Sequence, residues 1–95
     1  MNRTQKAKCR KIAEKYGMRS QEQQAVSELA ELLEVLTRRQ NQRGNDWRNK
    51  LIDEIADVRI MLEQLQTLHD IDSETISEQI DYKLNRQLGR IEKGE

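Results

Sequence analysis

The chain has 95 residues, and 17 Lys and Arg balance 17 Asp and Glu to give a formal net charge of zero. This length predicts one domain over residues 1–95, and so short a chain buries only about 60–65% of its unfolded surface, which favours a partner subunit. The sequence shows no apolar run near the roughly 18 residues of a membrane span, no secretory signal and only one cysteine, so we expect a cytoplasmic protein that stays out of the membrane.

The chain has no proline and only three aromatic residues, a composition that favours helices over a sheet. The first predicted helix has apolar residues at i, i+3, i+4 and i+7, namely Cys9, Ile12, Ala13 and Tyr16, and Gly17 is suited to end it. Ser20 and Gln23 then form a capping-box pattern, which predicts that the second helix opens at Ser20. This part of the chain is basic: residues 1–19 hold seven basic side chains and one acidic one.

The second helix has an apolar band wider than one neighbouring helix would cover, which predicts packing on more than one side. The band consists of Val26, Leu29, Leu33 and Leu36, flanked by Ala25, Ala30, Leu32 and Val35. A polar loop over residues 38–46 follows, and Asp46 is the expected N-cap of the third helix.

The third helix has the most regular apolar spacing, at Leu51, Ile55, Val58, Leu62 and Leu65. Residues 70–73 break it and supply a new N-cap. The fourth helix then has apolar residues at Ile76, Ile80, Leu84, Leu88 and Ile91.

The two central helices contain related four-residue segments, Glu28-Leu29-Ala30-Glu31 and Glu54-Ile55-Ala56-Asp57. Each places two carboxylates one helical turn apart. In an antiparallel hairpin, facing residues share a constant sum of residue numbers. Glu31 with Glu54 and Glu28 with Asp57 both give 85, so four carboxylates should converge at one level.

Four carboxylates repel one another unless a cation lies among them. Mg²⁺ prefers oxygen ligands, and the lack of His and Cys among these four residues argues against zinc. However, the sequence has five acidic pairs at i, i+3, and such pairs usually belong to a solvated helix face. From the residues alone, a metal site and a solvated acidic face both stay open.

The order S-E-L-A-E-L-L, a gap, then D-E-I-A-D-V-R-I-M-L-E-Q-L resembles the MazG-like, all-α nucleoside triphosphate pyrophosphohydrolases, most closely their small, stand-alone, phage-type members. The family motif is EExxE, a spacer, then ExxD, and the 22-residue spacer here lies within the family's range. The flanks Tyr16-Gly17, residues 83–86 and Arg90-Ile91 extend the likeness over most of the chain. One departure is Ser27, which stands where the family has its first Glu.

The resemblance implies a four-helix MazG-like fold with a central antiparallel hairpin, completed by oligomerisation into a homodimer or homotetramer. It implies hydrolysis of a nucleoside or deoxynucleoside triphosphate to the monophosphate and pyrophosphate, with Mg²⁺ as cofactor and Mn²⁺ as a substitute. The implied metal ligands are Glu28, Glu31, Glu54 and Asp57. Either Glu28 or Glu31 is expected to act as the catalytic base.

Substrate-binding residues are predicted in two places. Lys83, Arg86 and Arg90 form one basic face on the fourth helix, which could hold phosphates or could be a solvated stripe. Gln24, one turn before Glu28, could reach a base or sugar, and an exposed polar residue explains it equally well.

Two other functions compete with the enzyme. A nucleic-acid-binding module would use the basic residues of the first helix, although the rest of the chain is acidic and offers few aromatic side chains for stacking. A non-catalytic helical adaptor would use the apolar stripes, but it has no use for four converging carboxylates.

Overall fold

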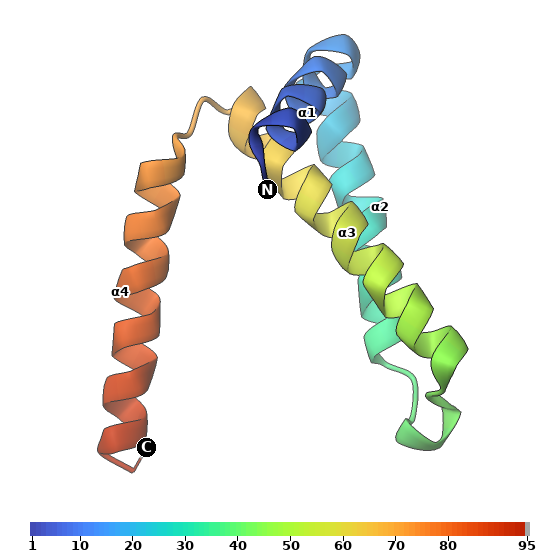
Figure 1. The fold of residues 1–95 in the computed structure, drawn as a ribbon, viewed down its shortest axis with the longest axis vertical. Coiled ribbons are helices and arrows are strands. Elements are labelled where there is room, and N and C mark those ends of the chain that lie inside the picture. The colour runs from blue at the N-terminus through green and yellow to red at the C-terminus, as the bar shows by residue number, and fades with distance from the viewer. Residues whose placement is uncertain (95) are drawn as a thin grey trace.

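The computed structural model describes residues 1–94, and every regular element within them is helical (Figure 1). Glu95, the last residue of the predicted domain, lies outside the described residues. The elements are α1 (Arg3–Tyr16), α2 (Met18–Leu36), a 3₁₀ turn η1 (Gln40–Gln42), α3 (Asn45–Leu68) and α4 (Ser73–Glu92). The predicted all-α class with four α-helices is confirmed for this part of the chain.

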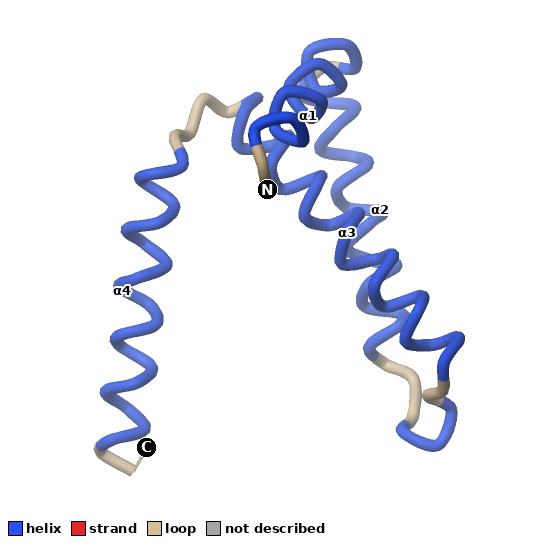
Figure 2. The backbone as a smooth tube through the Cα atoms, in the orientation of Figure 1, coloured by secondary structure: helices blue, strands red, loops and turns tan. Residues whose placement is uncertain are grey.

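Helices α2 and α3 form the central antiparallel hairpin, joined by the loop that carries η1 (Figure 2). Ala25 and Val35 of α2 and Val58 and Met61 of α3 are buried between the packed helices. Trp47 fastens the loop end of the hairpin, because its indole Nε1 donates a 2.8 Å hydrogen bond to the carbonyl of Val35. Apolar burial and this bond together fix the register of the two helices.

Helix α1 packs on α3 and on the start of α2, with Cys9 and Ala13 buried beneath it. Its N-terminus is closed by a capping box in which Asn2 accepts from the backbone N–H of Gln5, and Gln5 accepts from that of Asn2. Both groups satisfy N–H donors that the first helical turn leaves free. This cap was not among the features predicted for the first helix.

The junction of α1 and α2 differs from the prediction. The second helix begins at Met18, and the predicted capping box at Ser20 is wrong, because Gly17 alone makes the turn. Its φ of 84° and ψ of 168° belong to a region that only glycine adopts readily, so one residue both ends α1 and precedes α2. Ser20 therefore lies inside the first turn and a half of α2.

The predicted N-cap of the third helix is also wrong. Gly44 occupies this position, and its carbonyl accepts the first helical hydrogen bond from the N–H of Arg48. Asp46 lies in the first turn instead, where its charge still suits the positive end of the helix dipole. The break at 70–73 agrees with the prediction: Asp70 has a φ of 55°, and Asp72 caps α4 by accepting from the N–H of Thr75 at 2.7 Å.

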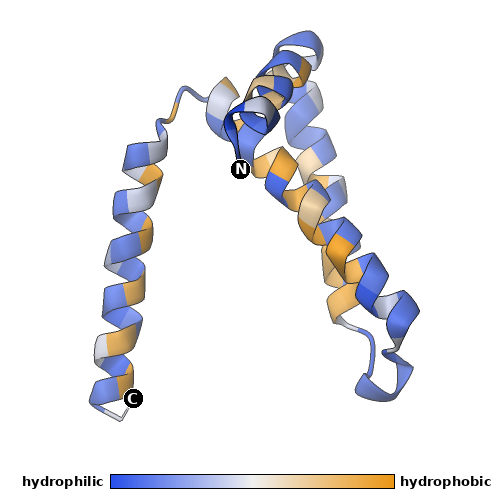
Figure 3. Cartoon of the chain, in the orientation of Figure 1, coloured by the Kyte–Doolittle hydropathy of each residue, from blue (hydrophilic) through white to orange (hydrophobic). Residues whose placement is uncertain are grey.

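Helix α4 runs apart from the hairpin and, within residues 1–94, makes at most a marginal contact with another helix (Figure 1). Its apolar residues line one side, as Figure 3 shows, and all of them are exposed: Ile76, Ile80, Leu84, Leu88 and Ile91. The radius of gyration of 16.3 Å exceeds the value of about 12 Å for a compact chain of this length. The single chain is therefore extended and leaves its fourth helix uncovered.

A second apolar surface stays open on α2. Val26, Leu29, Leu33 and Leu36 are between 48% and 68% exposed, although they formed the main line of the predicted stripe. The chain's accessible area of 7938 Å² compares with about 5,700 Å² for a compact monomer of 11.3 kDa. Considering residues 1–94, we find no helix with the length and apolar character needed to cross a membrane.

Candidate metal centre between α2 and α3

The hairpin brings together the four carboxylates whose residue numbers predicted that they face one another across it. Glu28 and Glu31 come from α2, and Glu54 and Asp57 come from α3. One carboxylate oxygen of each lies within 4.8 Å of the others. The i, i+3 spacing places each pair on one helix face, and the antiparallel register sets the two pairs opposite each other. Four oxygens at this separation form a group that a single cation could bridge.

Burial and mutual repulsion raise the pKa of two of these carboxyl groups. Glu54 is only 7% exposed, and its pKa is raised by burial first, then by the neighbouring charges of Glu31, Asp57 and Glu28. The pKa of Asp57 is raised by burial and by the charges of Glu28 and Asp53. Without a cation, the site therefore favours holding protons.

Hydrogen bonding leaves two of the oxygens unsatisfied. Gln24 donates a 2.8 Å hydrogen bond to Oε1 of Glu28, but Oε2 of Glu28 is buried and has no partner among the described residues. The same is true of Oε2 of Glu54 within residues 1–94. Buried polar atoms are normally paired, so these orphaned oxygens point to a ligand. An all-oxygen set with two buried free acceptors fits a hard divalent cation.

The protein supplies little positive charge at the cluster. In residues 1–94, the one ion pair with a separation of 4.0 Å or less joins His69 and Glu22, at 3.8 Å and away from the four carboxylates. Val58 and Met61 form the buried apolar layer beside the site. The cluster is therefore neither neutralised by a Lys or Arg partner nor fully solvated, which distinguishes it from an ordinary acidic helix face.

The predicted substrate residues are divided between two regions. Gln24 adjoins the cluster through its bond to Glu28. Lys83 and Arg86 lie on α4, which is separate from the hairpin, so one chain does not bring them to the carboxylates. Arg86 lies over the ring of Tyr82, with Cζ 5.6 Å from the ring centroid. Ser27, next to Glu28, is exposed.

A hollow beside the cluster was missed by the sequence analysis. It has a volume of about 360 Å³, and its lining comes from α1, α2 and α3, including Gln21, Gln24, Glu28 and Gln64. Gln21 and Gln64 are buried, at 5% and 2% exposure. The spacing of Gln21, Gln24 and Glu28 at i, i+3 and i+7 was the available signal, but only the packing of three helices shows that they line one hollow with Gln64.

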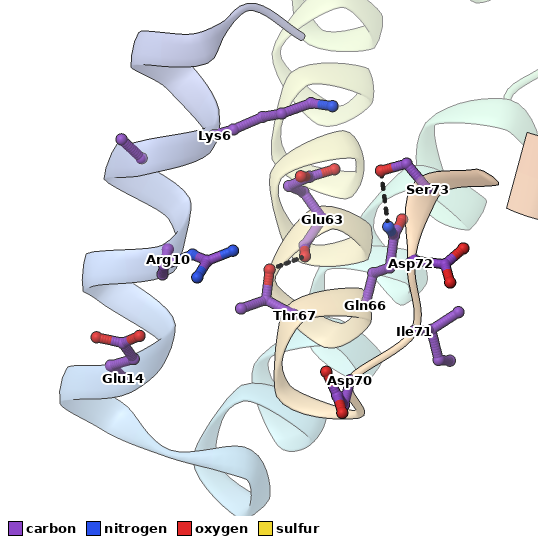
Figure 4. Close-up of a pocket in the computed structure, with 11 residues that line it drawn as sticks. Lys6, Arg10, Glu14, Glu63, Gln66, Thr67, Asp70, Ile71, Asp72 and Ser73 are labelled. Carbon is purple, nitrogen blue, oxygen red and sulfur yellow. Dashed lines mark hydrogen bonds between the residues drawn. The ribbon is translucent and has the colours of Figure 1, made fainter. Parts of the chain in front are cut away.

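A second hollow is lined by two of the basic side chains of α1. Lys6 and Arg10 of α1 line it together with Glu63 of α3 and with Asp70 and Asp72 of the α3–α4 linker (Figure 4). Its volume is about 570 Å³. Two of the basic side chains proposed for nucleic-acid contact therefore stand beside acidic groups of their own chain, which weakens their attraction for phosphate.

Comparison of the chain with protein-family models, with curated proteins and with solved structures found no match.

Proposed function

We propose that the protein has a MazG-like fold and is a Mg²⁺-dependent hydrolase that converts a nucleoside or deoxynucleoside triphosphate to the monophosphate and pyrophosphate. The observation that carries the proposal is the convergence of Glu28, Glu31, Glu54 and Asp57, with free buried oxygens on two of them. These oxygens would hold Mg²⁺, with Mn²⁺ as a substitute. When bound, the ion would supply charge neutralisation for the phosphate oxygens of the substrate.

The chain's own residues would act on the attacking water. Glu28 or Glu31 would accept the water proton while the water oxygen forms a bond to the α-phosphorus, and the bond from that phosphorus to the bridging oxygen breaks. The pyrophosphate leaves with the bonding electron pair. Gln24 would orient Glu28, because its amide already donates to one oxygen of that carboxylate.

A second copy of the chain completes this proposal. The accessible area exceeds that of a compact monomer by about 2,200 Å², well over the roughly 800 Å² that each partner buries in a standard interface. The open stripes of α2 and α4 are the surfaces to be covered, giving a homodimer or homotetramer. Residues 51–68 of α3 carry four acids and one base, so they also complement the basic face of α4 in charge.

Oligomerisation also offers a place for Lys83 and Arg86. Lys83 lies on the flank of the apolar stripe, about 100° around α4 from Leu84, whereas Arg86 lies about 160° from both Leu84 and Leu88. If the stripe docks on a second copy, Lys83 lies along the edge of that contact and Arg86 lies on the outer side of α4. In this arrangement α4 of one copy would hold phosphate groups near the carboxylates of the other.

The adaptor remains the principal competitor, because the exposed stripe of α4 would serve it equally well. An adaptor gains nothing from converging carboxylates that carry two buried, unpaired oxygens, whereas a metal enzyme uses such oxygens as ligands. Mg²⁺ binding separates the two functions, since only the enzyme should gain thermal stability from the ion.

Product analysis tests the proposal. Ordinary nucleoside and deoxynucleoside triphosphates incubated with the protein and Mg²⁺ should yield monophosphate and pyrophosphate. Glu54→Gln should abolish the reaction while the protein stays folded, and Glu34→Gln, an exposed acid on α2, should leave it unchanged. Activity retained in Glu54→Gln would show that the cluster is not the catalytic centre.

A further inference from the structure

The hollow beside the carboxylate cluster contains a buried acceptor that the fold leaves unused. Gln21 is only 5% exposed, and its Oε1 has no hydrogen-bond partner among residues 1–94. A carboxamide oxygen that loses water on folding is costly unless a partner replaces the water. Since Gln21 lines the hollow, a molecule bound there is the available source of that partner.

The hollow also has the composition of a small-ligand site. Its volume of about 360 Å³ is within the range of such sites, and Ile12 and Met61 contribute apolar walls beside a few polar groups. Tyr16 lies at the end of α1 with 61% of its surface exposed, so its ring is accessible to a flat ligand.

Glu28 belongs both to this hollow and to the carboxylate cluster. A ligand whose phosphates lie at the cluster would therefore extend its remaining part past Gln24 and toward Gln21. That remaining part of a nucleotide is the sugar and the base, and every common nucleobase has N–H groups able to donate to a carboxamide oxygen.

We propose that the hollow between α1, α2 and α3 binds the base of the nucleotide, and that Oε1 of Gln21 accepts a hydrogen bond from a base N–H group. The inference rests on the proposed function, because it assumes that the phosphates lie at the carboxylate cluster. It makes Gln21 a determinant of base preference and gives it no part in the hydrolysis step.

Binding of the reaction product tests this without any hydrolysis. The four common nucleoside monophosphates and ribose 5-phosphate are titrated, with Mg²⁺ present, into the wild type and Gln21→Leu, followed by NMR. The matched control is Gln23→Leu, an exposed glutamine on the same helix. Gln21→Leu should weaken binding of the preferred monophosphate about 3- to 10-fold, as expected for one hydrogen bond, and leave ribose 5-phosphate unaffected.

A ligand modification keeps the test independent of folding. A monophosphate whose base N–H groups are methylated should bind the wild type more weakly than the unmethylated compound, by a similar factor. The two compounds should bind Gln21→Leu equally well. Equal losses on both proteins, or a wild type that binds monophosphates no better than ribose 5-phosphate, would overturn the base site. Base-dependent binding by a protein that hydrolyses nothing would sustain this site and reject the proposed function.

Discussion

Gln24 donates a 2.8 Å hydrogen bond to one oxygen of Glu28, whereas the other oxygen of Glu28 is buried without a partner in the described residues. The carboxylate is therefore held in position by one oxygen and left with a free acceptor at the other. Such an arrangement is typical of a metal ligand that is oriented by a neighbouring side chain.

Removing one charge from the cluster should change how the protein responds to Mg²⁺. We expect Mg²⁺ to raise the melting temperature of the wild type, because the ion binds the folded cluster and not the unfolded chain. Glu54→Gln should melt higher than the wild type in EDTA, since repulsion is relieved, and should gain much less from Mg²⁺. Differential scanning fluorimetry measures both effects, with Glu34→Gln as the control that behaves like the wild type. Equal Mg²⁺ shifts in the two variants would contradict the metal centre.

The raised pKa values of Glu54 and Asp57 predict the direction of the pH dependence of stability. Their ordinary values are 4.5 and 3.8, so above these the folded state binds more protons than the unfolded chain. The free energy of unfolding in EDTA should therefore fall as the pH rises through the raised pKa values, and urea denaturation should show less stability at about pH 7.5 than at about pH 5.

Two comparisons control this pH experiment. The cap residue Asp72 has a lowered pKa, so its contribution is present above 3.8 and is lost only as the pH falls further. Mg²⁺ should reverse the trend, because it binds the deprotonated carboxylates more strongly as the pH rises. Stability that increases between these two pH values in EDTA would show that the cluster is not strained.

Charge placed on the α4 stripe should disrupt the oligomer. Leu84 is 57% exposed in the single chain, and Leu84→Glu would place a carboxylate in the proposed contact between copies. Sedimentation velocity should show a dimer or tetramer for the wild type and a monomer for the variant. Thr75→Glu, at an exposed position about 180° around α4 from Leu84, is the matched control and should keep the wild-type mass. A monomeric wild type at micromolar concentration would refute the oligomer.

A substitution at the α1–α2 junction tests the role of its glycine. Gly17→Ala should lower the free energy of unfolding by about 1–3 kcal/mol, because the φ of 84° is strained for a residue with a side chain. Gly44→Ala is the control, since Gly44 has extended backbone angles and, as at Gly17, no described atom lies within 4 Å of an added Cβ. Urea denaturation should find the control close to the wild type. Equal losses would indicate a general effect of removing glycine.

Local patterns predicted the helices and much of the site. Apolar spacing and Gly17 located the four helices, and the residue sums placed Glu28 and Glu31 opposite Glu54 and Asp57, because hairpin register is simple arithmetic. Helix starts were less predictable. Gly17 and Gly44 replaced the expected side-chain caps, since a glycine can take the required backbone angles without a capping side chain.

Features that depend on packing between distant segments were not predictable. The hollow containing Gln21 needs α1 to lie beside α2 and α3, which no spacing within a helix reveals. Likewise, the apolar spacing of α4 indicates a buried face without identifying the surface that buries it. In the single chain no other described helix covers this face of α4, so Leu84 and Leu88 are exposed.

The most direct test of the account identifies the phosphorus atom that water attacks. The protein is incubated with a nucleoside triphosphate and Mg²⁺ in ¹⁸O-labelled water, and the products are analysed by mass spectrometry and ³¹P NMR. Attack at the α-phosphorus should give equal amounts of monophosphate and pyrophosphate, with the label in the monophosphate, and no products with Glu54→Gln. Release of inorganic phosphate with a nucleoside diphosphate, or label in the pyrophosphate, would contradict the proposed reaction.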